Sequence, residues 1–429
     1  MANSAQANGG VATDLRRLNP MERIYQPQCD AVRTHCQKAS ERRNRSLTLF
    51  ALALGSFCIG TSEFASMGIL QLFSADLNIG IPAATNAITA YALGVIVGAP
   101  LVTLAAARLN RRTLLLALVG LFILGNIASA LAPSLPLLMA ARFVSGMPQG
   151  AYFGAGAVVA SYIVGPGHAG KAFAMVMTGL TVATIVGSPL ATFLGQTLGW
   201  RETYLAVSGV AALALLSLLR WVPRAEALNG APVLRELRAL RKPSVWGVML
   251  VGAIGVASIF AVYTFIGPLV TDVAGLERGW IPLALALFGL GMTAGNLLGG
   301  RIADGDPVRG IAIGYGAALL VLIVLAVGGT DPWVLFPAMF GVGATMMTAI
   351  PTLQVRLTRF APEAPSLMGA MNLAALNVAN ALGAWAGGLA IGAGAGLLAA
   401  VWAGFGLTLA GLAIYGVTLL AARGHRSAA

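Results

Sequence analysis

Twelve apolar segments, most about twenty residues or longer and separated by short polar connections, dominate this sequence. A helix of that length, rising 1.5 Å per residue, crosses the roughly 30 Å of hydrocarbon in a bilayer. Only 10% of the residues are charged, against about 25% in a soluble domain. We therefore predict an all-α membrane protein with transmembrane helices at 46–73, 82–107, 113–131, 135–164, 172–198, 204–222, 245–270, 281–302, 310–327, 333–353, 366–391 and 394–421.

The positive charge of the chain follows the connections between these segments. The net charge is +12, which in a soluble protein would suggest nucleic acid as a partner. Here the Lys and Arg residues gather in alternate connections, as they do when charge sets orientation in a bilayer. We expect a lipid bilayer and no nucleic acid as partner, with both termini and the central connection in the cytoplasm.

The longest and most charged connection, 223–244, divides the helices six and six. We predict two pseudo-symmetric six-helix bundles, 46–222 and 245–421, joined by this linker and flanked by a disordered tail, 1–45, and a short tail, 422–429. The connection after the second helix, TLAAARLNRR, and that after the eighth, GRIADGDPVR, favour a parallel repeat. Short basic turns are also common in polytopic proteins without a repeat.

Glu63 is the only formally charged residue between positions 46 and 73. An acid at membrane depth costs about 2.5 kcal/mol or more, and such residues usually face a cavity and have a function. Glu63 is therefore the leading functional candidate, and three His and three scattered Cys offer neither a second proton carrier nor a metal site.

Arg142, in the fourth predicted helix, lies on a polar and small-residue face with Gln149 and Tyr152. From the helix ends, both Glu63 and Arg142 fall roughly 10–15 Å below the outer surface. We predict that the two pair, because buried charges in membranes usually do. The alternative is that each reaches separately toward the interface and they never meet.

The predicted pair suggests proton coupling. Glu63 could gain a proton on one side of the membrane and release it on the other, while Arg142 stays charged. Polar residues of both halves are predicted to line a substrate cavity: Tyr91, Gln149, Tyr152, Tyr263, Asn372, Asn377 and Asn380. For the asparagines of the eleventh helix, hydrogen bonding between helices is an equally supported alternative.

The fifth predicted helix contains Gly187 and Pro189, which predict a bend that serves as a seal or hinge or has no function. No GxxxxGK[ST], HExxH, CxxC or GxSxG motif occurs. We therefore predict no enzyme activity, no ATP drive and no cofactor or metal.

Several segments resemble the major facilitator superfamily, in particular its twelve-helix drug and sugar proton-antiporter branch and the arabinose-efflux-like inner-membrane permeases. They are FCIGTSEFASMGIL, AITAYALGVIVGAPL, RFVSGMPQGAYFG, GSPLATFLGQTLGWRETY and MNLAALNVANALGAWAGG. The resemblance covers residues 46–421 and implies that Arg142 couples protons. The antiporter motif is partial, since Gly187-Ser188-Pro189 replaces an adjacent Gly-Pro.

The gating loop motif of the family is only partly present. It aligns with Thr103, Ala107, Arg108, Asn110, Arg111 and Arg112, and its Gly and Asp are missing, so the usual salt bridge cannot form there. The second copy keeps Gly300, Arg301 and Asp304, which the resemblance implies as gating residues on the cytoplasmic side.

The resemblance implies a secondary transporter of the bacterial inner membrane that exports small organic solutes in exchange for protons by alternating access. We expect it to be a monomer. Proton-coupled uptake in the same fold is the first alternative. A receptor without transport is the second, against which the short connections argue, because they leave no soluble sensing domain.

Overall fold

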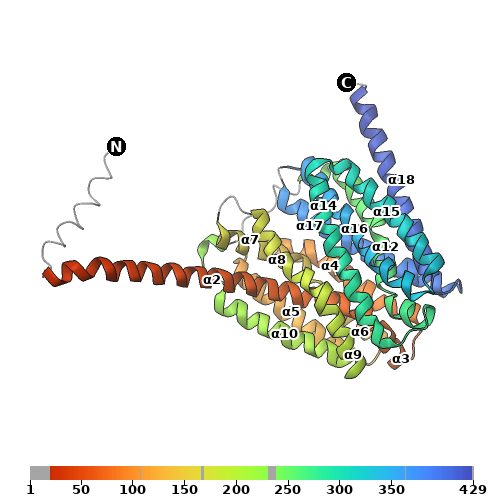
Figure 1. The fold of residues 1–429 in the computed structure, drawn as a ribbon, viewed down its shortest axis with the longest axis horizontal. Coiled ribbons are helices and arrows are strands. Elements are labelled where there is room, and N and C mark those ends of the chain that lie inside the picture. Colours follow the sequence, from red (N-terminus) through yellow and green to blue (C-terminus); the bar gives the residue numbers. More distant parts are fainter. Residues whose placement is uncertain (1–19, 107, 166–168, 230–237, 363, 428–429) are drawn as a thin grey trace.

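The computed structural model describes residues 20–106, 108–165, 169–229, 238–362 and 364–427 (Figure 1). Every regular element in these ranges is a helix, which confirms the predicted all-α class. Apolar side chains alternate along the elements between neighbouring helices and the outer surface, where many leucines are exposed. That distribution is expected of helices that contact lipid on one side and protein on the other.

The N-terminal half comprises the elements up to residue 221. They are α2 (Pro20–Gly68), α3 (Leu70–Asp76), α4 (Ile81–Ala105), α5 (Arg111–Ala130), α6 (Leu135–Gly146), α7 (Pro148–Val164), α8 (Ala169–Val182), the π-helix η2 (Ala183–Gly187), α9 (Ser188–Thr197) and α10 (Trp200–Trp221). A short 3₁₀ turn, η3 (Glu226–Leu228), follows in the linker.

The C-terminal half begins at residue 243. Its elements are α11 (Pro243–Gly255), α12 (Ala257–Tyr263), α13 (Ile266–Pro268), the π-helix η5 (Leu269–Val273), the 3₁₀ turn η6 (Arg278–Trp280), α14 (Ile281–Gly305), α15 (Pro307–Gly328), α16 (Pro332–Phe360), α17 (Pro365–Gly392) and α18 (Ala399–Ser427).

Within the described residues, eleven helices are long and apolar enough to cross a membrane. The fourth of the twelve predicted spans is also helical, but it is broken into α6 and α7 at Met147. Pro148 explains the break, because it has no N–H to donate to the preceding turn and its ring crowds the carbonyl four residues back. Each piece is then too short to count as a span alone.

The N-terminal boundary differs from the prediction. Residues 1–45 were expected to be a disordered tail, but α2 begins at Pro20 and runs without interruption into the membrane span, whereas residues 1–19 lie outside the described part. The segment after Pro20 is rich in Glu, Arg, Gln and Ala, which have high helix propensity. The helix propensity of the residues before position 46 therefore explains why α2 begins ahead of the apolar segment.

The two halves pack against each other mainly at one end. We call the end of each half next to the linker the linker end, and the opposite end the far end. At the far end, residues of α2, α3 and α4 share one apolar cluster with the C-terminal half. At the linker end, the N-terminal half has its own cluster, and Leu373 of α17 is the only described residue from the C-terminal half that packs on it. In Figure 1 the terminal ends of α2 and α18 accordingly point in different directions.

Hydrogen bonds reinforce this far-end contact. Gln71 Nε2 donates to Thr271 Oγ1 at 2.9 Å and to Asp272 Oδ2 at 3.3 Å. Gln196 Nε2 donates to the Arg278 carbonyl at 2.8 Å. The halves are thus joined by polar contacts from α3 and α9 to the η5–η6 segment.

An ion pair ties together the far end of the N-terminal half itself. The Arg201 guanidinium and the Trp200 indole N–H both donate to Asp76 Oδ2. These hydrogen bonds, first from Arg201 and then from Trp200, hold the pKa of the Asp76 carboxyl below its usual range. The pair links the end of α3 to the start of α10 outside the membrane spans.

Candidate functional site

Glu63 lies five residues before the end of α2 at Gly68 and is only 6% exposed. Its Oε2 accepts a hydrogen bond from Gln149 Nε2 at 2.9 Å, and its Oε1 accepts one from Asn380 Nδ2 at 3.1 Å. Gln149 is on α7 and Asn380 is on α17. One carboxylate is therefore bonded to both halves of the molecule. Glu63 is also the only buried acid among the described residues.

Arg142, on α6, is completely buried. It lies next to Ser62, the residue that precedes Glu63 in α2. Its Nη1 donates to Ser62 Oγ at 2.9 Å and its Nη2 to the Ser62 carbonyl at 3.1 Å. The guanidinium carbon lies 4.3 Å from the centre of the Tyr91 ring and 5.2 Å from that of Tyr204. Aromatic faces attract a cation, most strongly where water is excluded.

Arg142 lies close to the turn of α2 that carries Glu63, but the predicted direct contact is not observed. Among the described residues Arg142 and Glu63 form no ion pair within 4.0 Å. Arg142 instead bonds to Ser62, the residue preceding Glu63 in α2. Successive residues on a helix point about 100° apart, so Ser62 and Glu63 face different neighbours. Glu63 and Arg142 thus form two adjacent polar centres instead of an ion pair. Their charges interact without direct contact.

Ser62 and Asn126 complete the arginine centre, and neither was predicted as a site residue. Ser62 Oγ donates to Asn126 Oδ1 at 2.6 Å, while Asn126 Nδ2 donates to the Phe122 carbonyl of its own helix, α5. Both side chains are completely buried. Their signal in the sequence is a polar residue inside an apolar run, which is weak because serine and asparagine also occur in helix contacts.

Close packing of small residues positions α6 against α4. A Cβ atom on Gly94 would lie 2.1 Å from the Phe143 carbonyl oxygen, and one on Gly146 would lie 2.2 Å from the Tyr91 carbonyl oxygen. No side chain fits at such distances, so these glycines allow the two backbones to touch. The contact places the Tyr91 ring of α4 over Arg142 of α6.

Four of the predicted cavity residues carry a buried polar atom without a hydrogen-bond partner among the described residues. These atoms are Tyr91 Oη, Gln149 Oε1, Asn377 Oδ1 and Asn380 Oδ1. Nearly all buried polar groups in proteins are paired, and an unpaired one costs about 1–3 kcal/mol. Three of the four, on Tyr91, Gln149 and Asn380, belong to side chains that contact Arg142 or Glu63, which marks this region as one that can bind a polar ligand.

Tyr263 joins the same region from the C-terminal half. Its hydroxyl lies 2.9 Å from Ser188 Oγ of α9, and its ring packs edge-on against Phe64 and Phe288 with centroids 5.3 Å and 4.8 Å apart. Phe64 follows Glu63 in α2. The carboxylate therefore has an aromatic cluster beside it that is built from both halves.

The remaining predicted cavity residues are more dispersed. Tyr152 is completely buried, but its hydroxyl donates to the Leu52 carbonyl at 2.8 Å, within the linker-end cluster of the N-terminal half. Asn377 Nδ2 donates to the Leu373 carbonyl of its own helix at 3.0 Å, and Asn372 is buried one to two turns nearer the linker end. Only Asn380 of the three asparagines bonds to Glu63.

The predicted irregularity in the fifth span is present. The π-helix η2 ends at Gly187, and α9 starts at Ser188 with Pro189 in its first turn. A Cβ on Gly187 would lie 2.2 Å from Thr61 Oγ1 of α2. The irregular segment thus packs closely beside the turn of α2 that carries Glu63.

The predicted gating residues lie at the linker ends, and no hydrogen bond or ion pair joins those of the two halves among the described side chains. Arg108 and Arg301 are exposed, whereas Arg111 is partly buried at the start of α5. A Cβ on Gly300 would meet no atom within 4 Å. Asp304 belongs to α14, but its side chain is outside the described part of the chain. Arg112 donates to the Leu219 carbonyl of α10.

No group of three or more His, Cys, Asp or Glu that could hold a metal ion occurs among the described residues. The chemistry available at the site is therefore that of one carboxyl group, one permanently charged guanidinium and several amides and hydroxyls. Such a set can bind and release a proton and can hydrogen-bond a polar solute.

Two helical halves in one chain, with buried charged groups at the contact between them, are the construction of a secondary transporter. Residues 52–384 match the Major Facilitator Superfamily, and the chain belongs to this family. It is therefore a multi-pass membrane transporter and not an enzyme, as predicted from the motifs.

Relatives cover most of the chain. It is 39% identical over 368 residues to the inner membrane transport protein YdhP of Escherichia coli K12, covering 84% of this chain and 94% of that protein. It is 35% identical over 361 residues to a chloramphenicol resistance protein of Streptomyces lividans, covering 83% and 92%.

A solved structure has the same fold. It is the crystal structure of a bacterial homologue of the human lysosomal transporter Spinster in an inward-facing and occupied conformation. The TM-score is 0.69 at 15% sequence identity, and the match covers 88% of this chain and 97% of that one.

Proposed function

We propose that this transporter exports small organic solutes in exchange for protons by alternating access, as a monomer in the bacterial inner membrane. The termini and linker are placed in the cytoplasm by the alternating distribution of Lys and Arg. The observation that carries the proposal is the position of Glu63, a buried carboxylate that accepts hydrogen bonds from Gln149 in one half and Asn380 in the other.

In this geometry, protonation of Glu63 changes the hydrogen bonds that it makes to Gln149 and Asn380. An ionised Glu63 accepts from both amides, whereas a protonated one has its own O–H to donate. Gln149 Oε1 and Asn380 Oδ1, which have no described partner, become acceptors if either amide turns over. A proton on Glu63 thus rearranges the contact with Asn380, which crosses between the halves.

Arg142 acts in this scheme as a fixed positive charge. Guanidinium does not deprotonate at accessible pH, so proton traffic falls to Glu63. Ser62 and the Tyr91 ring hold the cation in place without neutralising it. Its field favours the ionised carboxylate and thereby the release of the proton to the side that is open.

The surroundings favour an organic solute of moderate polarity. Phe64, Tyr263 and Phe288 offer aromatic surface beside the carboxylate, and the unpaired oxygens of Gln149 and Asn380 offer acceptors. A relative bears the name chloramphenicol resistance protein, which supports export of such compounds. Because the halves meet at their far ends, we assign the structure to the state open toward the linker side.

Everted membrane vesicles test the direction and the coupling. An inside-acid gradient is built by respiration and followed with a pH-sensitive dye while a panel of organic compounds is added. Antiport predicts that a transported compound collapses the gradient, and that vesicles without the protein do not respond. If whole cells accumulate the compound with protons and everted vesicles give no response, the protein is an uptake symporter.

A further inference from the structure

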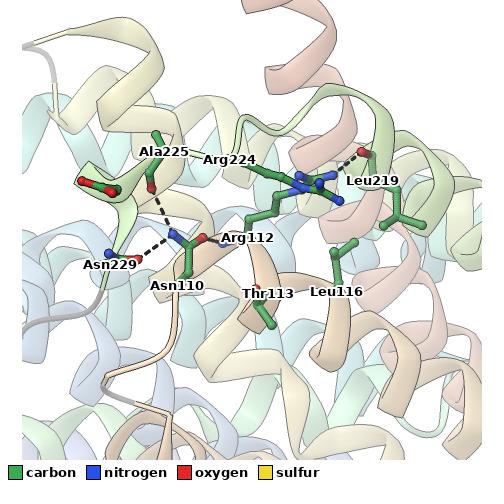
Figure 2. A pocket seen from close by; sticks show the side chains of 9 residues that line it. Asn110, Arg112, Thr113, Leu116, Leu219, Arg224, Ala225 and Asn229 are labelled. Atoms are coloured by element: carbon green, nitrogen blue, oxygen red, sulfur yellow. Dashed lines mark hydrogen bonds between the residues drawn. The ribbon is translucent and has the colours of Figure 1, made fainter.

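A recess of about 350 Å³ lies at the linker end of the N-terminal half, far from Glu63 (Figure 2). It is formed by the start of α5, the end of α10 and the η3 segment of the linker. Its lining residues are Asn110, Arg112, Thr113, Leu116, Leu219, Arg224, Ala225, Glu226 and Asn229.

Two guanidinium groups lie together in the recess. Figure 2 shows the side chains of Arg112 and Arg224 converging from α5 and from the linker. Arg112 Nη2 donates to the Leu219 carbonyl at 2.5 Å, and its buried Nε has no partner among the described residues. Glu226 also lines the recess, but no described carboxylate forms an ion pair with either arginine. Two like charges side by side favour an anion between them.

The wall of the recess is held by hydrogen bonds independent of any ligand. Asn110 caps α5 by accepting from the Arg112 backbone N–H at 3.0 Å. The other side of the same amide donates to the Ala225 carbonyl at 3.0 Å and to Asn229 Oδ1 at 2.8 Å, as Figure 2 shows. These bonds fix the linker to the start of α5 and thereby hold the backbones that carry Arg112 and Arg224.

The opposite side of the recess is apolar. Leu116 and Leu219 line it, and Leu219 is 44% exposed. One turn earlier on α10, Leu216 is 60% exposed, so the recess continues into the outer apolar face of that helix. A charged end joined to an apolar face matches a phospholipid, whose phosphate would lie between the arginines and whose acyl chain would follow α10. A free phosphate would use only the charged end.

We propose that this recess binds the phosphodiester headgroup of an anionic phospholipid, with Arg112 and Arg224 as its phosphate ligands. Bidentate guanidinium pairs suit phosphate oxygens, and basic pockets between helices at the cytoplasmic boundary are suited to anionic lipid. The lipid joins α5, α10 and the linker, and this binding is independent of which solute the protein carries.

Native mass spectrometry of the purified full chain tests the proposal with phosphatidylglycerol as probe and phosphatidylcholine as reference. We expect Arg112→Gln/Arg224→Gln to retain phosphatidylglycerol at least fivefold more weakly than the wild type. Arg301→Gln, which removes one charge at the linker end of the other half, is the matched control for Arg224→Gln alone and should retain it fully. If the double variant fails to fold, Arg224→Gln decides, because this exposed side chain makes no hydrogen bond among the described residues.

Equal retention by the wild type and the arginine variants overturns the proposal. Inorganic phosphate provides the second arm. The lipid assignment predicts that millimolar phosphate leaves bound phosphatidylglycerol in place. Displacement of the lipid by phosphate at that concentration would show that the recess is a site for the free ion and would overturn the lipid assignment.

Discussion

Single residues at the site act through partners that the linear pattern does not reveal. Ser62 accepts from Arg142 through both its Oγ and its carbonyl, and it donates to Asn126. Ser62 therefore connects the buried Arg142 guanidinium to Asn126 of α5 by hydrogen bonds. A small side chain beside Glu63 is thus as important to the arginine centre as the aromatic rings over it.

Replacing Ser62 by Ala should destabilise the protein by about 1–3 kcal/mol, because Arg142 and Asn126 each lose a buried partner. Thermal unfolding in detergent measures the effect. Ser56→Ala is the matched control, since Ser56 is equally buried on α2 but bonds only to the Leu52 carbonyl of its own helix. Equal melting temperatures for the two variants would contradict the role given to Ser62.

The sequence was sufficient for part of this site and not for the rest. The cost of an isolated charge made Glu63 and Arg142 evident, and helix geometry gave their depth. The choice of partner could not be predicted, because Ser62 and Glu63 are neighbours in the chain and either could have faced α6. Asn380 is 317 residues from Glu63, and only the packing of the two halves selects it from three asparagines.

At the scale of elements, close backbone contacts decide how α4 and α6 carry Tyr91 and Arg142. The apolar pattern predicted where these helices lie but not that the fourth span divides at Met147. Proline in a membrane helix bends it in some contexts and is accommodated in others. The outcome depends on neighbours such as Gly94, which meets the backbone of Phe143.

Gly94→Ala should be destabilising by about 1–3 kcal/mol, because its Cβ would collide with the Phe143 carbonyl and force the helices apart. Gly120→Ala in α5 is the control, since nothing lies within 4 Å of its Cβ position, and alanine there should be neutral or stabilising by up to about 1 kcal/mol. Thermal unfolding compares them. A stable Gly94→Ala protein would refute the close contact of α4 with α6.

The Asp76–Arg201 pair predicts a pH-dependent stability. The pKa of Asp76 is lower in the folded than in the unfolded chain, so the pair stabilises the fold above the unfolded value of about 3.9 and loses this effect as the pH falls. Asp76→Asn should therefore melt at a lower temperature than the wild type at pH 7, and the difference should shrink below about pH 4.

Unfolding of this variant is compared with Glu277→Gln, an exposed acid at the far end of the other half without an ion pair among the described residues. The control should follow the wild type at every pH. A constant difference between Asp76→Asn and the wild type from pH 3 to pH 7 would show that the ionised pair is not the cause.

At the scale of the whole molecule, the two halves are in contact at the far end and separate toward the linker end. Alternating access requires that far-end contacts such as that of Gln71 with Thr271 break in each cycle. The sequence predicted the two halves from the position of the linker. It could not predict which ends would be in contact, because the proposed alternating access uses both arrangements of one chain.

A covalent link at the far end should therefore stop transport. We expect Gln71→Cys/Thr271→Cys, joined by a short reducible cross-linker, to lose at least nine-tenths of solute flux in vesicles and to regain it on reduction. Asp76→Cys/Arg201→Cys carries the same link within one half and should keep its flux. Full flux through the chain cross-linked between its halves would rule out rocking of the halves at this end.

The central claim is that Glu63 carries the proton. Its most direct test is the proton flux that a transported compound drives in everted vesicles containing Glu63→Gln, with Glu202→Gln as the control for loss of an exposed acid in the same half. Glu63→Gln should show no compound-dependent proton flux at wild-type protein levels, and Glu202→Gln should show full flux. Wild-type proton flux in the Glu63→Gln protein would contradict this claim.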